Sequence, residues 1–460
     1  MRPVAADPGS FRDPGGRVFI DDGRVLRAVY GPNASAYEAA RDSGFLDELI
    51  EKGSLVASRE IELGSHAAGA GGCYLLEHDK VPFVSYPYEW SFAQLRRAAL
   101  LQLDLLLEAL PRGFTLTDAT AYNVQFIGSE PIFIDHLSLR PYKDGEIWAA
   151  HRQFCMQFLN PLIFWSKLGV PPNGWYRGSL EGIAPEDLAP LLRLRNKLSL
   201  TVASHVVAPT VLKRRTSSPE VVRGPARALS RDAFIAMLLQ LKNFITGLKR
   251  PAGDTVWESY DSNNSYADAE AAAKHGFVAQ MVAQAKPQML FDLGCNSGDY
   301  SITGLQNGAA YVVGFDFDFG ALERAAERSS NDKLAFLPLW LDATNPSPDQ
   351  GWNQRERAGF NQRARGDAVI ALAFLHHLAI ARNIPLEAAV DWVMSVAPVG
   401  VIEFPPKSDP MVQQLLSLRE DIFPNYTEER FLEYVASRGR VTATKHLSEG
   451  GRLLVRYDRR

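Results

Sequence analysis

Apolar and polar positions recur at several different spacings along the chain, and each spacing predicts a different kind of structure. Residues 1–30 contain two short apolar runs among Asp-Pro-Gly and Asp-Asp-Gly turns, which predicts a β-hairpin. Helical spacing follows over residues 35–52 and again over 92–110, where leucine and alanine positions form one broad apolar face. Two further apolar runs within residues 123–134 flank a Gly-Ser-Glu turn and predict a second hairpin.

The second half of the chain changes to an alternation of strand and helix signals. Residues 146–248 are still mainly helical in pattern, and the polar segment 249–254, which contains proline and glycine, is the best candidate linker. Alternating strands and helices are typical of a parallel sheet with helices on both faces. The sequence therefore predicts an α+β, mostly helical domain over residues 1–250 and an α/β, Rossmann-like domain over residues 251–460.

Composition narrows the class of protein. The chain has 460 residues, 46% of them hydrophobic and 22% charged, and its net charge is −4. These values are typical of a globular protein of two or three domains, and they give no electrostatic footprint for nucleic acid. The strongest apolar stretch, residues 154–165, is too short and too interrupted to span a bilayer. The N-terminus lacks the apolar core of a signal peptide, so we expect a cytoplasmic protein without membrane attachment.

Cysteine usage gives no sign of a cross-linked or metal-bound framework. The three cysteines, Cys73, Cys155 and Cys295, are far apart in the sequence. An odd and sparse set of this kind argues against disulfides and against a cysteine zinc site. No other spacing of metal ligands is apparent, so the sequence predicts no metal site.

The most informative motif joins a short apolar run, residues 289–293, to a small-residue turn that ends at Gly298. A strand that leads through such a turn into a helix lets a ligand approach the backbone and directs N–H groups at its anionic parts. A second strand, residues 311–315, ends at Asp316, which is 24 positions after Asp292. That interval is close to the one expected for a carboxylate that binds a ribose diol.

The residues of the turn distinguish between cofactors. A dinucleotide fingerprint requires glycines in the pattern G-x-G-x-x-G, but Asn296 and Asp299 occupy the second and third glycine positions counted from Gly294. The pattern Asp-x-Gly-x-x-x-Gly, followed by an acid after the second strand, instead resembles that of class I S-adenosylmethionine-dependent methyltransferases. Asn296 replaces a glycine often found there, and asparagine tolerates the left-handed backbone better than other non-glycine residues.

The resemblance extends over residues 255–460. Asp342 follows a third strand, residues 366–378 resemble a fourth strand with its outgoing loop, and residues 399–404 resemble a fifth. Trp257, Tyr260 and Tyr266 precede the first strand, in a segment of the kind that covers the cofactor in this fold. At family level nearly the whole chain resembles bacterial methyltransferases grouped with the NoeA-type nodulation proteins.

The resemblance implies a set of roles in binding S-adenosylmethionine. Asp292 would orient the methionine amino group, Gly294 and Gly298 would give access to the backbone, Asp316 would hold the ribose hydroxyls, and Asp342 would contact the adenine edge. The complete set of cofactor residues expected on this basis is Asp292, Gly294, Cys295, Asn296, Gly298, Asp316, Phe317, Asp342, Ala343 and Tyr266.

Candidates for catalysis follow the fourth and fifth strands. A base near the transferred methyl group would help if the acceptor is a hydroxyl, and the pKa of a histidine suits that task. His376 and His377 follow the fourth strand, and Glu403 is close to the end of the fifth. Helix packing or loop anchoring is the alternative explanation for the two histidines.

One constellation in the first half resembles the catalytic loop of protein-kinase-like folds. Asn123 comes five residues after Asp118, and Asp135 ends a strand twelve residues later. In kinases the first Asp accepts the substrate proton, and the Asn and second Asp hold magnesium. A glycine-rich loop is missing and Arg27 is the nearest substitute for the usual lysine, so we expect a degenerate kinase-like domain. Structural roles for the three residues, as turn cap and as partners of buried backbone, remain an alternative.

The expected function is methyl transfer from S-adenosylmethionine to a small-molecule or glycan-type acceptor that the N-terminal domain presents. Nucleic acid is not an expected partner, and the sequence contains no indication of the oligomeric state. Two alternatives stay open. In one, both domains are binding modules and the second is a cofactor-binding scaffold; in the other, the first domain is also an active phosphotransferase.

Overall fold

The computed structural model describes residues 6–63, 72–216, 228–251, 265–417, 419–448 and 451–460. The chain forms two compact units. The first unit comprises Met1–Phe126, Glu130–Ala252 and Asp349–Arg357, and the second comprises Ile127–Ser129, Gly253–Pro348 and Ala358–Arg460.

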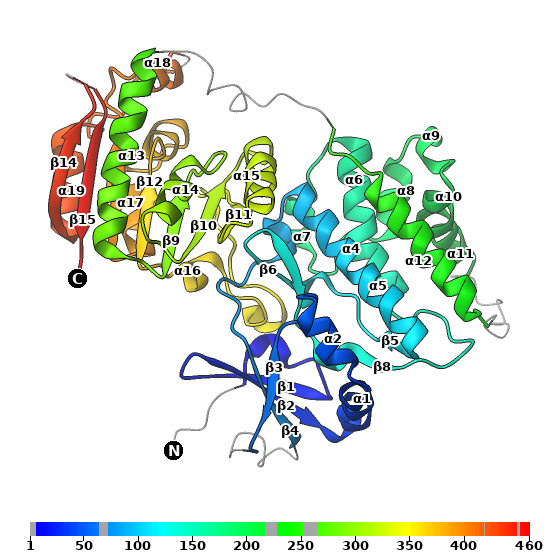
Figure 1. Ribbon diagram of the computed structural model, residues 1–460. Coiled ribbons are helices and arrows are strands. Elements are labelled where there is room, and N and C mark those ends of the chain that lie inside the picture. The colour runs from blue at the N-terminus through cyan, green and yellow to red at the C-terminus, as the bar shows by residue number, and fades with distance from the viewer. Residues whose placement is uncertain (1–5, 64–71, 217–227, 252–264, 418, 449–450) are drawn as a thin grey trace. The chain divides into compact units, whose positions relative to one another are not determined.

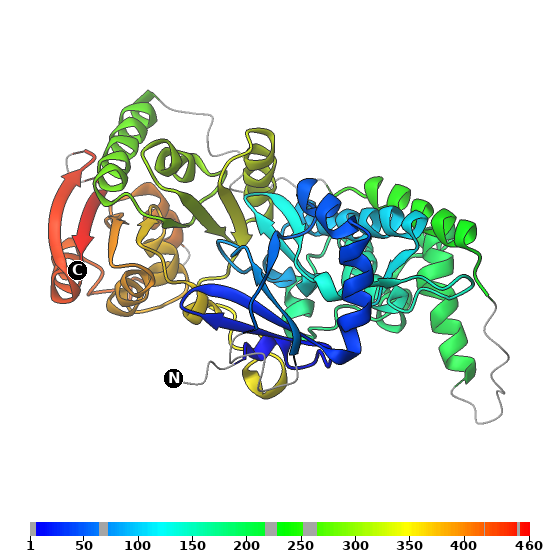
Figure 2. The same ribbon diagram turned by 60° about the horizontal axis from the view of Figure 1, so that its bottom comes forward.

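The first unit begins with a four-stranded antiparallel sheet in the order β1-β2-β4-β3. The expected hairpin is confirmed, since β1 and β2 are joined at Asp22 and Gly23, which both have positive φ as a tight hairpin turn requires. The helix expected over residues 35–52 is divided in two at Gly44, whose φ is 74°. Figure 2 shows these strands and helices in blue. Their bounds are β1 Gly16–Asp21, β2 Arg24–Tyr30, α1 Gly31–Asp42, α2 Phe45–Glu51, β3 Ser58–Ile61 and β4 Gly72–His78.

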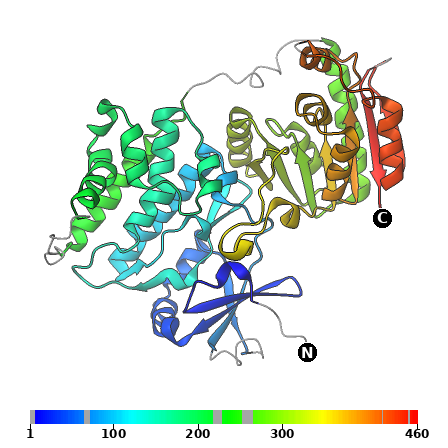
Figure 3. The same ribbon diagram turned by 180° about the vertical axis from the view of Figure 1, so that it is seen from behind.

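The rest of the first unit is mainly helical and is organised around α4, Phe92–Ala109. Ser91 caps this helix and forms a reciprocal capping box with Gln94, which explains why the helix begins there. The helices of this part are seen from behind in Figure 3. The other elements are β5 Phe114–Leu116, β6 Val124–Ile127, β7 Glu130–Phe133, β8 Leu139–Pro141, α5 His151–Phe154, α6 Asn160–Leu168, α7 Asn173–Gly178, α8 Pro185–Leu191, α9 Leu194–Lys197, α10 Leu200–Val202, α11 Ala208–Thr216 and α12 Arg231–Thr246.

The second unit contains a seven-stranded sheet in the order β11-β10-β9-β12-β13-β15-β14 (Figure 1). The first five strands of that order are parallel, and β15 is antiparallel to both of its neighbours. The elements are α13 Ser265–Ala285, β9 Met289–Leu293, α14 Asp299–Gln306, β10 Tyr311–Asp316, α15 Phe319–Asn331, β11 Phe336–Trp340, α16 Phe360–Arg363, β12 Ala368–Ala371, α17 Leu386–Val396, β13 Val399–Phe404, α18 Pro410–Leu416, α19 Glu428–Arg438, β14 Arg440–His446 and β15 Leu453–Asp458.

Helices cover both faces of this sheet, as the alternating pattern predicts. Helix α13 packs against α14, and α17 packs against α19; the first pair lies in front of the sheet in Figure 1. The central strands are continuous apolar runs because parallel strands between two helical layers are buried on both sides. Leu290, Val312, Ile370 and Val401 from four neighbouring strands are almost wholly inaccessible and belong to one core. The Rossmann-like α/β domain expected in the second half is therefore present.

Among the residues that the structure describes, no helix is long and apolar enough to cross a membrane.

Candidate active site

The candidate site of the second unit lies at the carboxyl ends of β9 and β10. The order of strands reverses at β9, since β10 lies on one side of it and β12 on the other. In doubly wound sheets, ligands bind at such a switch point, beyond the carboxyl ends of the strands. Asp292 in β9 and Asp316 at the end of β10 are both at this edge.

Asp292 is buried, with 2% of its surface exposed. Its carboxylate accepts a hydrogen bond of 2.7 Å from the hydroxyl of Ser301 in α14. Burial raises the pKa of Asp292 to about 7, and the charges of Asp316 and Asp299 act in the same direction. A carboxyl group held in this way is a good receptor for a cationic ligand group, because a nearby positive charge would relieve the cost of ionising it.

Asp316 holds the turn against the neighbouring strand. Its two carboxylate oxygens accept backbone N–H bonds of 2.9 Å from Asn296 and from Asp318. Burial raises the pKa of Asp316 to about 6. Asn296 has a φ of 49°, so it does adopt the left-handed backbone that replacement of a glycine requires.

The turn itself presents backbone rather than bulky side chains. Gly294 and Gly298 have φ values of 81° and 91°, and Gly298 directly precedes the first residue of α14. Cys295 is buried in the core and packs against Gly314, so only its backbone belongs to the turn. A ligand placed at the turn would therefore meet main-chain groups and the N-terminal end of α14.

The other expected cofactor residues differ in how exposed they are and in which groups they contact. Phe317 is 54% exposed beside Asp316 and offers an unpaired aromatic face. Asp342 follows β11 and accepts hydrogen bonds from the backbone and hydroxyl of Thr344, while Ala343 is partly buried. Trp257 and Tyr260 are outside the described residues, and so is the side chain of Tyr266.

The composition of the site fits S-adenosylmethionine. That cofactor carries a sulfonium, an ammonium group and a ribose diol. Beside a glycine turn the site offers the buried carboxyl group of Asp292 and the partly buried one of Asp316, both of raised pKa. Both carboxyl groups are at adjacent strand ends, which is where the two halves of an extended nucleoside ligand are held in this architecture.

The two histidines after β12 are adjacent and largely withdrawn from water. Their ring centroids are 4.0 Å apart. Burial lowers the pKa of His376 to about 2 and that of His377 to about 4, and the positive charge of Arg452 adds to both effects. His376 is 1% exposed, and within the described part of the chain its Nδ1 has no hydrogen-bond partner. Both rings are therefore neutral at physiological pH, and they are weaker bases than an exposed histidine.

Glu403 is one member of a buried ion pair that the sequence did not predict. Its side chain is wholly inaccessible and forms an ion pair of 2.7 Å with Lys274 from α13. Arg452 approaches the same carboxylate at 3.5 Å, and the backbone N–H of Ala373 donates to it at 2.5 Å. Glu403 thereby anchors the loop that leads from β12 to His376. Only the fold brings Lys274 to this strand, so sequence spacing could not have identified it.

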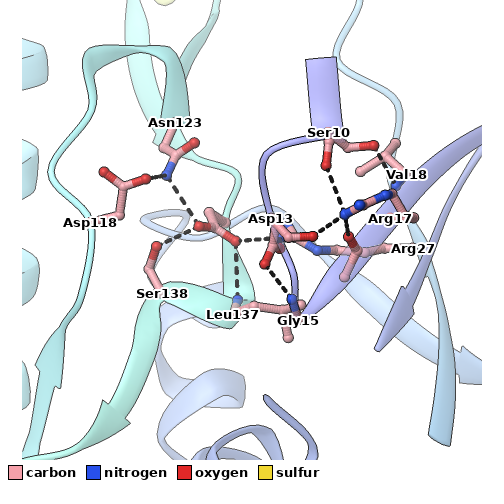
Figure 4. Close-up of polar contacts among 12 residues, drawn as sticks. Ser10, Asp13, Gly15, Arg17, Val18, Arg27, Asp118, Asn123, Leu137 and Ser138 are labelled. Atoms are coloured by element: carbon pink, nitrogen blue, oxygen red, sulfur yellow. Dashed lines mark hydrogen bonds and ion pairs between the residues drawn. The ribbon is translucent and has the colours of Figure 1, made fainter. Parts of the chain in front are cut away.

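In the first unit, Asp118, Asn123 and Asp135 come together as their spacing predicts. Figure 4 shows the side chain of Asn123 pointing toward Asp118. The amide of Asn123 donates to Asp118 at 3.5 Å and to Asp135 at 3.1 Å. Asp135 also forms an ion pair of 2.8 Å with Arg27, and Arg27 contacts Asp13 at 2.9 Å. An arginine thus supplies the positive charge that a metal ion would otherwise provide at this carboxylate.

The strand order of the second unit, its glycine turn and the acids at two adjacent strand ends define a Rossmann-like α/β domain. Nodulation protein NoeA of Rhizobium meliloti (strain 1021) is 48% identical over 468 residues, which cover 99% of this chain and 98% of that protein. The chain therefore belongs to the NoeA family of nodulation proteins. No family profile matches it.

Two solved structures are similar to part of the chain. Magnesium protoporphyrin IX methyltransferase (ChlM) from Synechocystis PCC 6803, with bound SAH, is 17% identical over 44% of this chain and 91% of that one, with a TM-score of 0.32. N-methyltransferase NodS from Bradyrhizobium japonicum WM9, in complex with S-adenosyl-L-homocysteine, is 12% identical over 45% of this chain and 93% of that one, with a TM-score of 0.32.

Proposed function

We propose that the second unit binds S-adenosylmethionine and transfers its methyl group to a small-molecule or glycan-type acceptor. The observation that carries this proposal is the pair of carboxyl groups at adjacent strand ends beside a glycine turn, Asp292, which is buried, and Asp316, which is partly buried. A buried carboxylate without a cation or hydrogen-bond donors is costly. The ammonium group of the ligand would supply a positive charge to Asp292, and its ribose hydroxyls would supply hydrogen bonds to Asp316.

Each residue has a defined task in the proposed complex. Asp316 accepts hydrogen bonds from the ribose hydroxyls, and Asp292 attracts the methionine ammonium group through the turn. The exposed ring of Phe317 packs against the adenine, and Asp342 accepts from the adenine amino group. Gly294 and Gly298 keep the turn free of side chains, so the carboxylate of the cofactor can reach the helix N-terminus.

The acceptor is expected beside the loop that follows β12. S-adenosylmethionine supplies an electrophilic methyl group, so the protein needs mainly to place a nucleophile in line and to keep water away. His377 is partly buried, and its neutral ring can orient an acceptor hydroxyl by hydrogen bonding. His376 is 1% exposed, and its ring lies against that of His377 at a centroid distance of 4.0 Å. Glu403 acts by positioning, since its carboxylate holds the loop through Ala373.

The first unit is proposed to present the acceptor or a partner rather than to transfer phosphate. The Arg27–Asp135 ion pair favours this role, because it fills the site at which kinases hold magnesium. Formation of S-adenosylhomocysteine separates methyl transfer from a role as a cofactor-binding scaffold, and magnesium-dependent nucleotide binding would support phosphotransfer.

We expect the full-length protein to bind S-adenosylmethionine and Asp316→Ala to bind it at least about tenfold more weakly, a loss of about 1.4 kcal/mol. The reason is the loss of the ribose acceptor. Isothermal titration calorimetry measures both affinities, with Asp332→Ala, an exposed acid at the end of α15, as the matched control. A folded wild-type protein that binds no cofactor would refute the methyltransferase proposal.

Cofactor affinity should also depend on pH. The pKa of Asp292 is raised to about 7, so this carboxyl group is mostly protonated at pH 6 and mostly ionised at pH 8. Since the ionised form attracts the ammonium group, affinity should rise with pH, by about tenfold between these values. Calorimetry across this range, repeated on Asp292→Asn, should give a flatter profile for the variant. Equal slopes for both proteins would assign the pH dependence to another group.

A further inference from the structure

Three metal-binding side chains meet in the helical part of the first unit, and none of them belongs to the two sets of residues described above. His151 and Cys155 are one helical turn apart in sequence, and His205 comes from a segment some fifty residues later. His151 Nε2 is 2.8 Å from His205 Nδ1, and the Cys155 sulfur is 3.6 Å from His151 Nε2. The three ligand atoms all lie within 4.8 Å of one another.

The backbone that carries two of these residues is unusual. Cys155 begins a π-helical segment, Cys155–Leu159, and His205 lies in the middle of a second one, Ala203–Val207. A π-helical turn inserts an extra residue into a helix and is often found at functional sites. Two such segments, each contributing a ligand to one cluster, indicate that the helices are shaped around the cluster.

We propose that His151, Cys155 and His205 form a zinc-binding site. Two imidazoles and one thiolate are ligands that Zn²⁺ prefers, and a site with three protein ligands leaves a fourth position for water or another ligand. Tetrahedral zinc with these ligands would hold the donor atoms about 3.3–3.8 Å apart. The separation of 3.6 Å between the Cys155 sulfur and His151 Nε2 already lies in that interval. The two imidazole nitrogens, which are 2.8 Å apart, would have to separate by about 0.5 Å to bind one ion. The site is a single-ion centre distinct from the carboxyl groups of the proposed cofactor site.

The neighbouring residues leave the cluster accessible on one side and restrict the orientation of one ligand. Cys155 is 1% and His205 6% exposed, while His151 is only partly buried and leaves the cluster within reach of an ion. Trp148 packs edge-on against the His151 ring at a centroid distance of 5.7 Å and restricts its orientation. Metal binding would form the zinc–sulfur bond and release the thiol proton of Cys155 to solvent.

The test uses the full-length protein, stripped with a chelator and titrated with Co²⁺ as an optical substitute for zinc. We expect about one equivalent to bind, with a sulfur-to-cobalt charge-transfer band that Zn²⁺ then abolishes. Cys155→Ser should lose the band, and His205→Gln should bind Zn²⁺ at least about tenfold more weakly. Cys73→Ser is the matched control, because Cys73 is an exposed thiol in the same unit, and it should keep both properties.

The spectrum of the wild-type protein with Co²⁺ tests the zinc proposal even if a variant fails to fold. If the folded wild-type protein gives no charge-transfer band, the cluster is a packed group of hydrogen-bonded side chains and the zinc proposal fails. It fails equally if the band persists in folded Cys155→Ser, because another thiol is then the ligand. Neither result bears on binding of S-adenosylmethionine, which is measured separately on the second unit.

Discussion

Gly298→Ala is expected to lower the free energy of unfolding of the second unit by about 2–5 kcal/mol. The φ of Gly298 is 91°, and an L-residue in left-handed backbone costs about 1–2 kcal/mol. A Cβ at this position would also come within 2.5 Å of Phe336 Cε1. Phe336 is wholly buried in the core and cannot withdraw, so overpacking adds about 1–3 kcal/mol.

Gly308→Ala separates these two contributions. Gly308 also has a positive φ, 108°, but a Cβ built there would meet nothing within 4 Å. This variant should therefore show only the conformational part of the loss. Urea unfolding of the full chain, followed by hydrogen exchange in peptides from β9 to β11, measures both variants in the unit concerned. Equal losses for the two variants would mean that the contact with Phe336 contributes nothing.

Local sequence patterns predicted the parts of the second unit that depend on local chemistry. The apolar run before Asp292, the small-residue turn and the acid at Asp316 follow from strand, turn and helix preferences, and the structure contains all of them. The prediction of a single helix over residues 35–52 was wrong, because the structure has two helices there. The helical spacing continues past Gly44, but the left-handed backbone there ends the first helix and begins the second.

Contacts between distant segments could not be predicted in the same way. Sequence spacing did not predict the proposed metal site, because His205 comes 54 residues after His151 along the chain. The pairing of Arg27 with Asp135 likewise depends on how the first sheet packs on the loop after β7. The spacing of Asp118, Asn123 and Asp135 did predict their meeting, but kinase-like ancestry for this unit stays a prediction.

Lys274→Met is expected to destabilise the second unit by about 3–5 kcal/mol, because removing one member of a buried ion pair leaves the other charge uncompensated. Glu403 is wholly buried and its ion pair with Lys274 is 2.7 Å long. Arg452, at 3.5 Å, is too distant to replace that contact fully. Loss of the pair should also loosen the loop at Ala373, so cofactor affinity and any methyl transfer should fall together. Chemical denaturation of the full chain measures the effect.

The double variant Lys274→Met/Glu403→Gln tests whether the unpaired charge is the cause. A glutamine oxygen can still accept the hydrogen bond from the Ala373 N–H, while no charge is left without a partner. Most of the lost stability should therefore return. Lys242→Met removes a half-exposed partner of Asp104 and should change stability by only about 0–1 kcal/mol. If the double variant is as unstable as Lys274→Met, the lysine stabilises the unit by packing, and Glu403 is left as a candidate for the chemistry itself.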